Sequence, residues 1–302
     1  MGAKITKIVK CIKLDNTYLN ADDLVDDFIK KIRPLDLIVF RTVDPISSSI
    51  QKLQDELTGY GEISHVGVAI SREYCDNINV TSDNKNNKNQ KTLYCWESTA
   101  SGWIGDGVKN AETGKASFGV QVRDMRSVVK KYLMNPNANI GVCRLIDNPI
   151  LKQKGETTSH YDRRIDDLKM KISIAYDNYN SNSFEFNPLV LLGALFPPMR
   201  PLRDAAYEVL EKYMGTFDKN AWLFCSEFVC LLYQQIGVIT DETDGVIDGK
   251  LPNPEEVLPA DLLGFDTDVD GINKPIVQCV IWIKNNRSEE YRDIYNEYEE
   301  EY

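Results

Sequence analysis

Residues 224–237, with the sequence FCSEFVCLLYQQIG, predict a helix that begins at Cys225 and is ended by Gly237. Apolar residues precede Cys225, so its sulfur would lie where the N–H groups of the helix start concentrate. Those groups act as about half a positive charge, which favours a thiolate over a thiol. They could also hold the oxyanion of a tetrahedral intermediate. Cys225 is therefore the candidate nucleophile, and the alternative is a small apolar residue in a core helix.

The sequence holds two histidines, which leaves two candidates for an imidazole base. The stretch HVGVAI, residues 65–70, alternates as a strand, with its apolar side chains on one face. The other face would carry His65, Gly67 and Ala69, which leaves space beside the imidazole. His160 falls in a polar connection, where a surface histidine is expected. His65 is the candidate base, and a purely structural histidine is the alternative.

Glu97, in the stretch CWES, lies on the next strand expected along the chain, at 93–97. If this strand pairs with 65–70, the Glu97 carboxylate could bind the imidazole nitrogen that faces away from sulfur. That bond would fix the tautomer and stabilise the imidazolium. The alternative is a glutamate at the rim of an edge strand.

The remaining pattern predicts an α+β fold in which an antiparallel sheet packs against the helix that carries Cys225. Further strands are expected at 37–40, 118–122, 140–145 and 276–283. Further helices are expected at 21–31, 46–57, 161–179, 188–195 and 204–213.

Composition narrows the function classes. The net charge of −11 argues against nucleic-acid binding, which needs a basic surface. Seven cysteines without a CxxC pair predict neither a metal site nor a disulfide framework, and no cofactor is expected. With no secretory signal and no apolar run of spanning length, we expect a cytoplasmic protein, either free or membrane-associated, and not a secreted one.

In chain order, the segments PLDLIVF, SHVGVAI, CWES, FCSEFVCLLYQQIG and LPADLLGF resemble the circularly permuted papain-like group of the NlpC superfamily, in its YiiX-like branch. Members occur in bacteria, in poxviruses and in other large DNA viruses, so the resemblance adds packaging in a virion to the expected locations. The resemblance covers about 33–145 and 205–265. It implies that Cys225 is the nucleophile, His65 the base and Glu97 the third, orienting group. Asp36 takes the place of the aspartate in the family's GD pair and is interpreted as structural, with Leu35 in place of the glycine.

The implied activity is that of a cysteine hydrolase or acyltransferase, which forms a thioester on Cys225 from an amide, an ester or a thioester. The acyl group could belong to a lipid or to a lipidated protein. Two alternatives stay open: a peptidase or isopeptidase of the same fold, and a non-catalytic binding or structural protein of a virion.

Three regions are expected: a basic helical segment at 1–32, the papain-like domain at 33–285 with a mostly helical insertion at about 147–215, and an acidic tyrosine-rich tail at 286–302. The start of the chain fits a myristoylation pattern at Gly2, and Cys11 is a candidate palmitoylation site behind it. A membrane surface is the partner expected for this segment, and a plain terminal helix or strand is the alternative. A protein partner is the corresponding expectation for the tail.

Overall fold

The computed structural model describes residues 21–42, 63–80, 92–99, 108–117, 119–135, 138–180, 223–240, 254, 257, 259, 262 and 276–283. The helices expected at 46–57, 188–195 and 204–213 lie outside these residues. So do Gly2, Cys11 and the tail at 286–302.

Six strands form one sheet in the order β4-β3-β2-β1-β5-β6, and every neighbouring pair is antiparallel. This confirms the expected α+β class and the antiparallel sheet. Each of the six predicted strand positions falls in a strand of this sheet. The strands are β1 Leu37–Thr42, β2 His65–Ser71, β3 Leu93–Thr99, β4 Gly119–Asp124, β5 Ala138–Leu145 and β6 Val277–Ile283.

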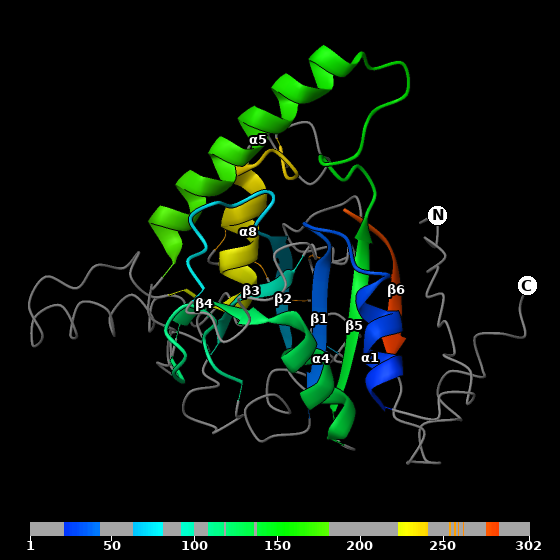
Figure 1. The fold of residues 1–302 in the computed structure, drawn as a ribbon, viewed down its shortest axis with the longest axis vertical. Helices are drawn as coiled ribbons and strands as arrows, with labels where there is room; N and C mark the ends of the chain where they lie inside the picture. The colour runs from blue at the N-terminus through cyan, green and yellow to red at the C-terminus, as the bar shows by residue number, and fades with distance from the viewer. Residues whose placement is uncertain are drawn as a thin grey trace, which may run out of the picture.

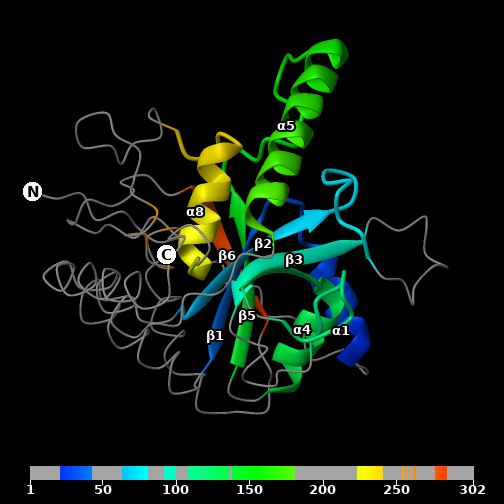
Figure 2. The same ribbon diagram turned by 90° about the vertical axis from the view of Figure 1, so that its left-hand side faces the viewer.

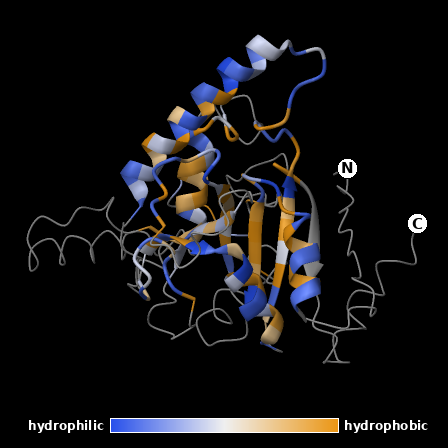
Figure 3. Cartoon of the chain, viewed as in Figure 1, coloured by the Kyte–Doolittle hydropathy of each residue, from blue (hydrophilic) through white to orange (hydrophobic). Residues whose placement is uncertain are grey.

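Helices cover both faces of the sheet (Figures 1 and 2). Helices α1 (Ala21–Ile29) and α4 (Met125–Met134) pack on one face, with side chains such as Phe40, Ala69 and Cys95. Helix α8 (Cys225–Gln235) packs on the other face over β2 and β3, and α5 (Thr158–Tyr179) packs against α8. Figure 3 shows β1 and α8 as mainly apolar, as two buried layers require.

Helix α4 was not expected from the sequence, although the signals for it are present. Asp124 caps its start by accepting a hydrogen bond from the backbone N–H of Ser127. Its buried residues recur at helical spacing and contact β3 and β5: Met125, Val128, Val129, Tyr132 and Leu133. The expected strand at 118–122 therefore leads directly into a helix that closes one face of the sheet.

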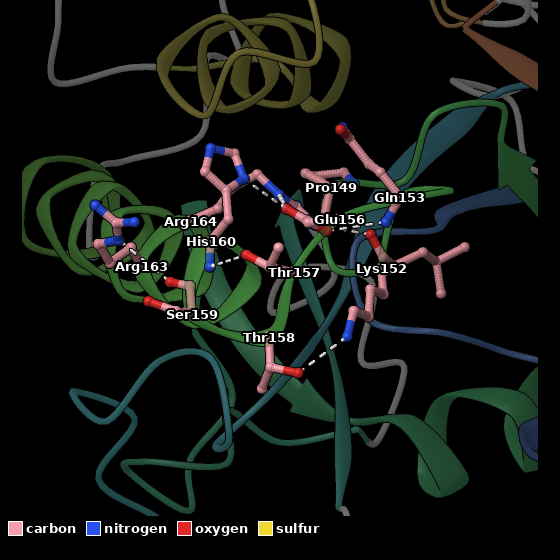
Figure 4. Close-up of polar contacts among 11 residues, drawn as sticks. Pro149, Lys152, Gln153, Glu156, Thr157, Thr158, Ser159, His160, Arg163 and Arg164 are labelled. Atoms are coloured by element: carbon pink, nitrogen blue, oxygen red, sulfur yellow. Dashed lines mark hydrogen bonds and ion pairs between the residues drawn. The ribbon is translucent and has the colours of Figure 1, made fainter.

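The placement of His160 in a polar connection is wrong, because α5 begins at Thr158 and His160 lies in its first turn. Glu156 organises this helix start (Figure 4). Its carboxylate accepts hydrogen bonds from Arg164 and from the backbone N–H of Gln153, and its Oε1 lies 3.2 Å from His160 Nδ1. The cluster fixes the start of α5 to the connection before it, where Arg164 also donates to the carbonyl of Leu151, and it occupies His160 on the surface.

The turn before β1 contains a leucine in a conformation that favours glycine. Leu35 has φ 68° and is fully buried. Neighbouring contacts fix it: its N–H donates to the carbonyl of Ala69, and its own carbonyl accepts from the Tyr233 hydroxyl at 2.8 Å. Asp36 follows and binds Arg144 at 2.9 Å. These contacts agree with a structural role for Asp36.

Within the described residues, no helix is long and apolar enough to cross a membrane.

Candidate active site

His65 and Glu97 meet across two neighbouring strands. Strands β2 and β3 pair with Val68 opposite Trp96 and Ala69 opposite Cys95, which brings the start of β2 beside the end of β3. The Nε2 atom of His65 lies 2.6 Å from Glu97 Oε2. The pairing expected from the sequence therefore exists. Glu97 is fully buried, and β3 lies between β2 and β4, so the alternative of a glutamate on an edge strand is wrong.

Gly67 makes this approach possible, although the space expected beside the imidazole is absent. A Cβ atom on Gly67 would lie 2.9 Å from Glu97 Cβ, 3.0 Å from Cys95 Sγ and 3.2 Å from the carbonyl oxygen of Trp96. The room that the missing side chain leaves is thus filled by β3 itself. Glycine at this position lets the acid-bearing strand come close to the histidine-bearing strand.

Arg123 of β4 is the second partner of Glu97, and it was not among the residues singled out from the sequence. Its Nε donates to Glu97 Oε1, and its side chain is 1% exposed. Cys95 lies opposite Arg123 and Glu97 lies opposite Gln121, so these side chains share one face of the sheet. Each oxygen of the Glu97 carboxylate therefore has one cationic or ionisable partner.

Cys225 completes the group from the other side of the sheet. It is the first residue of α8, as predicted, and its side chain lies close enough to His65 to raise the pKa of the imidazole. Because Nε2 of His65 is bound to Glu97, Nδ1 is the nitrogen left for the sulfur. The His65 ring also packs against Phe40, with ring centroids 5.0 Å apart, which restricts its rotation.

The electrostatics of the group favour charged forms in spite of burial. Burial lowers the pKa of His65, but the charge and hydrogen bond of Cys225, followed by those of Glu97, outweigh it and raise the pKa to about 9. Burial raises the pKa of Glu97, but Arg123 and His65 outweigh it and lower the pKa to about 2. Glu97 is therefore a carboxylate at neutral pH, and His65 is an imidazolium when it faces a Cys225 thiolate.

Two contacts set the position of the α8 start. The residue at its N-cap is Phe224, whose side chain has no acceptor, and its backbone N–H donates to the Glu227 carboxylate at 3.2 Å. Ser98 donates its hydroxyl hydrogen to the carbonyl of Leu223, two residues before Cys225. Strand β3 thus holds His65 through Glu97 on one face and the approach to Cys225 through Ser98 on the other.

Among the other described cysteines, Cys95 lies beside Glu97, and the second histidine takes no part in this group. Cys75, Cys95, Cys143 and Cys230 are buried, unbridged thiols. Burial, followed by the Glu97 charge, raises the pKa of Cys95 well above its usual value, so this neighbour stays a thiol. His160 is bound to Glu156 at the start of α5. No group of three or more His, Cys, Asp or Glu side chains that could hold a metal occurs among the residues with described positions.

Comparisons with family models, with curated proteins and with solved structures find no match to this chain.

Proposed function

We propose that this chain is a cysteine hydrolase or acyltransferase with a permuted papain-like fold. Cys225 is the nucleophile, His65 is its base, and Glu97 orients the imidazole. The arrangement that supports this is an antiparallel sheet against which a helix packs with the cysteine at its first residue. The histidine strand and the acid strand both precede that helix in the chain.

The observation that carries the proposal is the 2.6 Å contact of His65 Nε2 with the buried Glu97 carboxylate, beside a cysteine at the first residue of α8 that acts on the pKa of the same imidazole. A histidine with only a structural role needs one partner for each ring nitrogen, and a backbone carbonyl or water serves well. Here the partners are a buried carboxylate and a thiol at a helix start, which are the groups that orient a base and supply a nucleophile.

The chemistry follows from these positions. The thiol proton of Cys225 passes to Nδ1 of His65, and the thiolate attacks the carbonyl carbon of the acyl substrate. The backbone N–H groups at the start of α8 lie where they can stabilise the resulting oxyanion. When the tetrahedral intermediate collapses, the imidazolium returns its proton to the departing amine, alcohol or thiol, and a thioester remains on Cys225.

In the second half of the reaction, the thioester is cleaved and Cys225 becomes the leaving group. His65 accepts a proton from the incoming acceptor, the acceptor attacks the thioester, and the thiolate leaves with its charge stabilised by the imidazolium. Water as acceptor makes the protein a hydrolase, and another nucleophile makes it an acyltransferase. Glu97 accepts a hydrogen bond from Nε2–H throughout, so the ring keeps Nδ1 directed at the sulfur.

The experiment is acylation by p-nitrophenyl acetate, followed by release of p-nitrophenolate and by mass spectrometry of the Cys225 peptide. We expect an acetyl group on Cys225, its loss in Cys225→Ser, and a fall of acylation rate by about 10²-fold or more in His65→Ala. Cys230→Ser, in the same helix, and His160→Ala, the other histidine, are matched controls and should acylate like the unaltered protein. Acetylation of other cysteines with Cys225 left free, or no effect of His65→Ala, would overturn the proposal.

A further inference from the structure

The Arg123–Glu97 pair lies on an apolar face of the sheet. Both side chains are at most 1% exposed, and the surrounding cluster comes from α1, α4 and the central strands. A buried ion pair contributes little stability compared with apolar residues of similar size, because both charges lose their hydration. The stability of the fold therefore does not explain why the ion pair is present, and the contact of Glu97 with His65 suggests another role.

To orient His65, Glu97 must stay ionised although it is buried. Carboxyl groups in apolar surroundings favour the neutral form, and a protonated carboxyl on Oε2 would offer a donor to a ring nitrogen that must itself donate. The titratable groups that face Glu97 are His65 from β2, Cys95 from its own strand and Arg123 from β4, with Cys225 of α8 beyond His65. Arg123 is the one permanent cation in this set.

We propose that Arg123 is a positioning residue that keeps the Glu97 carboxylate ionised and directed at Nε2 of His65. The inference rests on the proposed function of the Cys225–His65 pair. Oε1 of Glu97 is occupied by the guanidinium, so only Oε2 is directed at the imidazole. The ring is held with its hydrogen on Nε2 and with Nδ1 toward Cys225. Once the Cys225 proton has passed to His65 in the proposed mechanism, the signs of the charges alternate from Arg123 to Cys225.

The same arrangement predicts what removal of the cation does. In Arg123→Gln, a neutral donor replaces the guanidinium, and burial acts on Glu97 without its main counterweight. The carboxyl then takes up a proton at a higher pH, and His65 loses its acceptor there. In the double variant Glu97→Gln/Arg123→Gln no carboxyl remains, so that titration must disappear.

The test is a pH titration of the full chain labelled with ¹⁵N-histidine. The two histidines give two sets of ring signals, and His160→Ala assigns them. A second pH profile comes from the rate at which iodoacetamide alkylates Cys225, measured by mass spectrometry of the peptide that contains it. The matched control is Arg144→Gln, which breaks a comparable pair with buried Asp36 outside the site. Loss of stability alone should affect the control and Arg123→Gln alike.

In Arg123→Gln we expect the low-pH transition (the acid limb) of the His65 ring signals and of the alkylation rate, which reports protonation of Glu97, to occur about one pH unit or more higher. One pH unit is a tenfold change in the proton affinity of the Glu97 carboxylate. Arg123→Lys and Arg144→Gln should keep the original profile, and the double variant should lack the new limb. An unchanged profile in Arg123→Gln, or the same new limb in the double variant, would overturn the role of Arg123. If the neutral variant does not fold, Arg123→Lys decides, because a shifted limb in that variant contradicts a role based on charge.

A failure of the proposed function can be told apart from a failure of the Arg123 proposal. Alkylation and acylation that ignore Cys225 in the unaltered protein would remove the nucleophile, whereas the His65 titration would still report whether Arg123 controls Glu97.

Discussion

Replacement of Gly67 by alanine tests whether the close approach of β2 and β3 is needed by the site. The added Cβ would meet Glu97 Cβ at 2.9 Å and the Trp96 carbonyl oxygen at 3.2 Å. Neither is the free end of a flexible side chain. The strands themselves must therefore separate.

The size of the effect follows from these distances. Carbon atoms in contact lie about 3.5–4.0 Å apart, so the gap between Gly67 and Glu97 must grow by at least about 0.6 Å. Overpacking of this kind costs about 1–3 kcal/mol of unfolding free energy. The 2.6 Å contact between His65 and Glu97 lies beside the new methyl group and lengthens with it. Because a misplacement of about 1 Å can cost about 10²-fold in rate, we expect roughly tenfold slower acylation of Cys225.

The assay combines urea unfolding with the acylation rate of Cys225. Gly155→Ala is the matched control, because Gly155 has φ +82° and no atom within 4 Å of a built Cβ. That change costs stability through backbone strain but lies away from the site, so its acylation rate should stay normal. Equal acylation rates in Gly67→Ala and the unaltered protein would refute the reasoning.

Three further predictions concern stability and positioning. Leu35→Gly should lower the free energy of unfolding in urea by about 1–2 kcal/mol less than Leu37→Gly does. Both leucines are fully buried, but only at position 35 does glycine relieve the strain of a positive φ. Folding raises the pKa of His65 from 6.5 to about 9, so the ionised ring stabilises the fold fully below pH 6.5, and this contribution is lost as the pH rises through 9. The unfolding free energy of the unaltered protein minus that of His65→Gln should fall over that range, and a flat difference contradicts the pairing. Ser98→Ala should lower the unfolding free energy by about 1 kcal/mol and slow acylation. Ser71→Ala should do neither, because the buried Ser71 hydroxyl has no hydrogen-bond partner among the described residues.

The sequence predicted those parts of the fold that local patterns determine. A continuous apolar run predicted β1 and alternation predicted β2, and the apolar helix from Cys225 was found with the correct first residue. Helix α4 was missed because its short apolar pattern follows β4 without a connecting loop, although Asp124 and the spacing of its buried residues indicate it. His160 was misplaced because Thr157, taken as part of a polar connection, is in fact a helix cap.

The candidate site was predictable as far as neighbouring strands allow. His65 and Glu97 could be paired because their strands were expected to be adjacent. Arg123 was not recognised because Gln121 and Arg123 alternate with Val120 and Val122, a pattern typical of a strand with one face in solvent. Only the packing of α1 and α4 on that face shows that the arginine is buried, and no local pattern contains this information.

The register of strand β3 determines when during folding the Cys225 site can form. Glu97 and Ser98 are adjacent, and their side chains leave opposite faces of the strand, one toward His65 and the other toward the carbonyl before Cys225. A slip of β3 by one residue exchanges these faces, so both contacts are lost together. The Ser98 contact also joins residues 125 positions apart, a closure that belongs late in folding. Under the proposed function, a chain that is still emerging or misaligned would therefore carry an unactivated Cys225 thiol and would not be acylated prematurely.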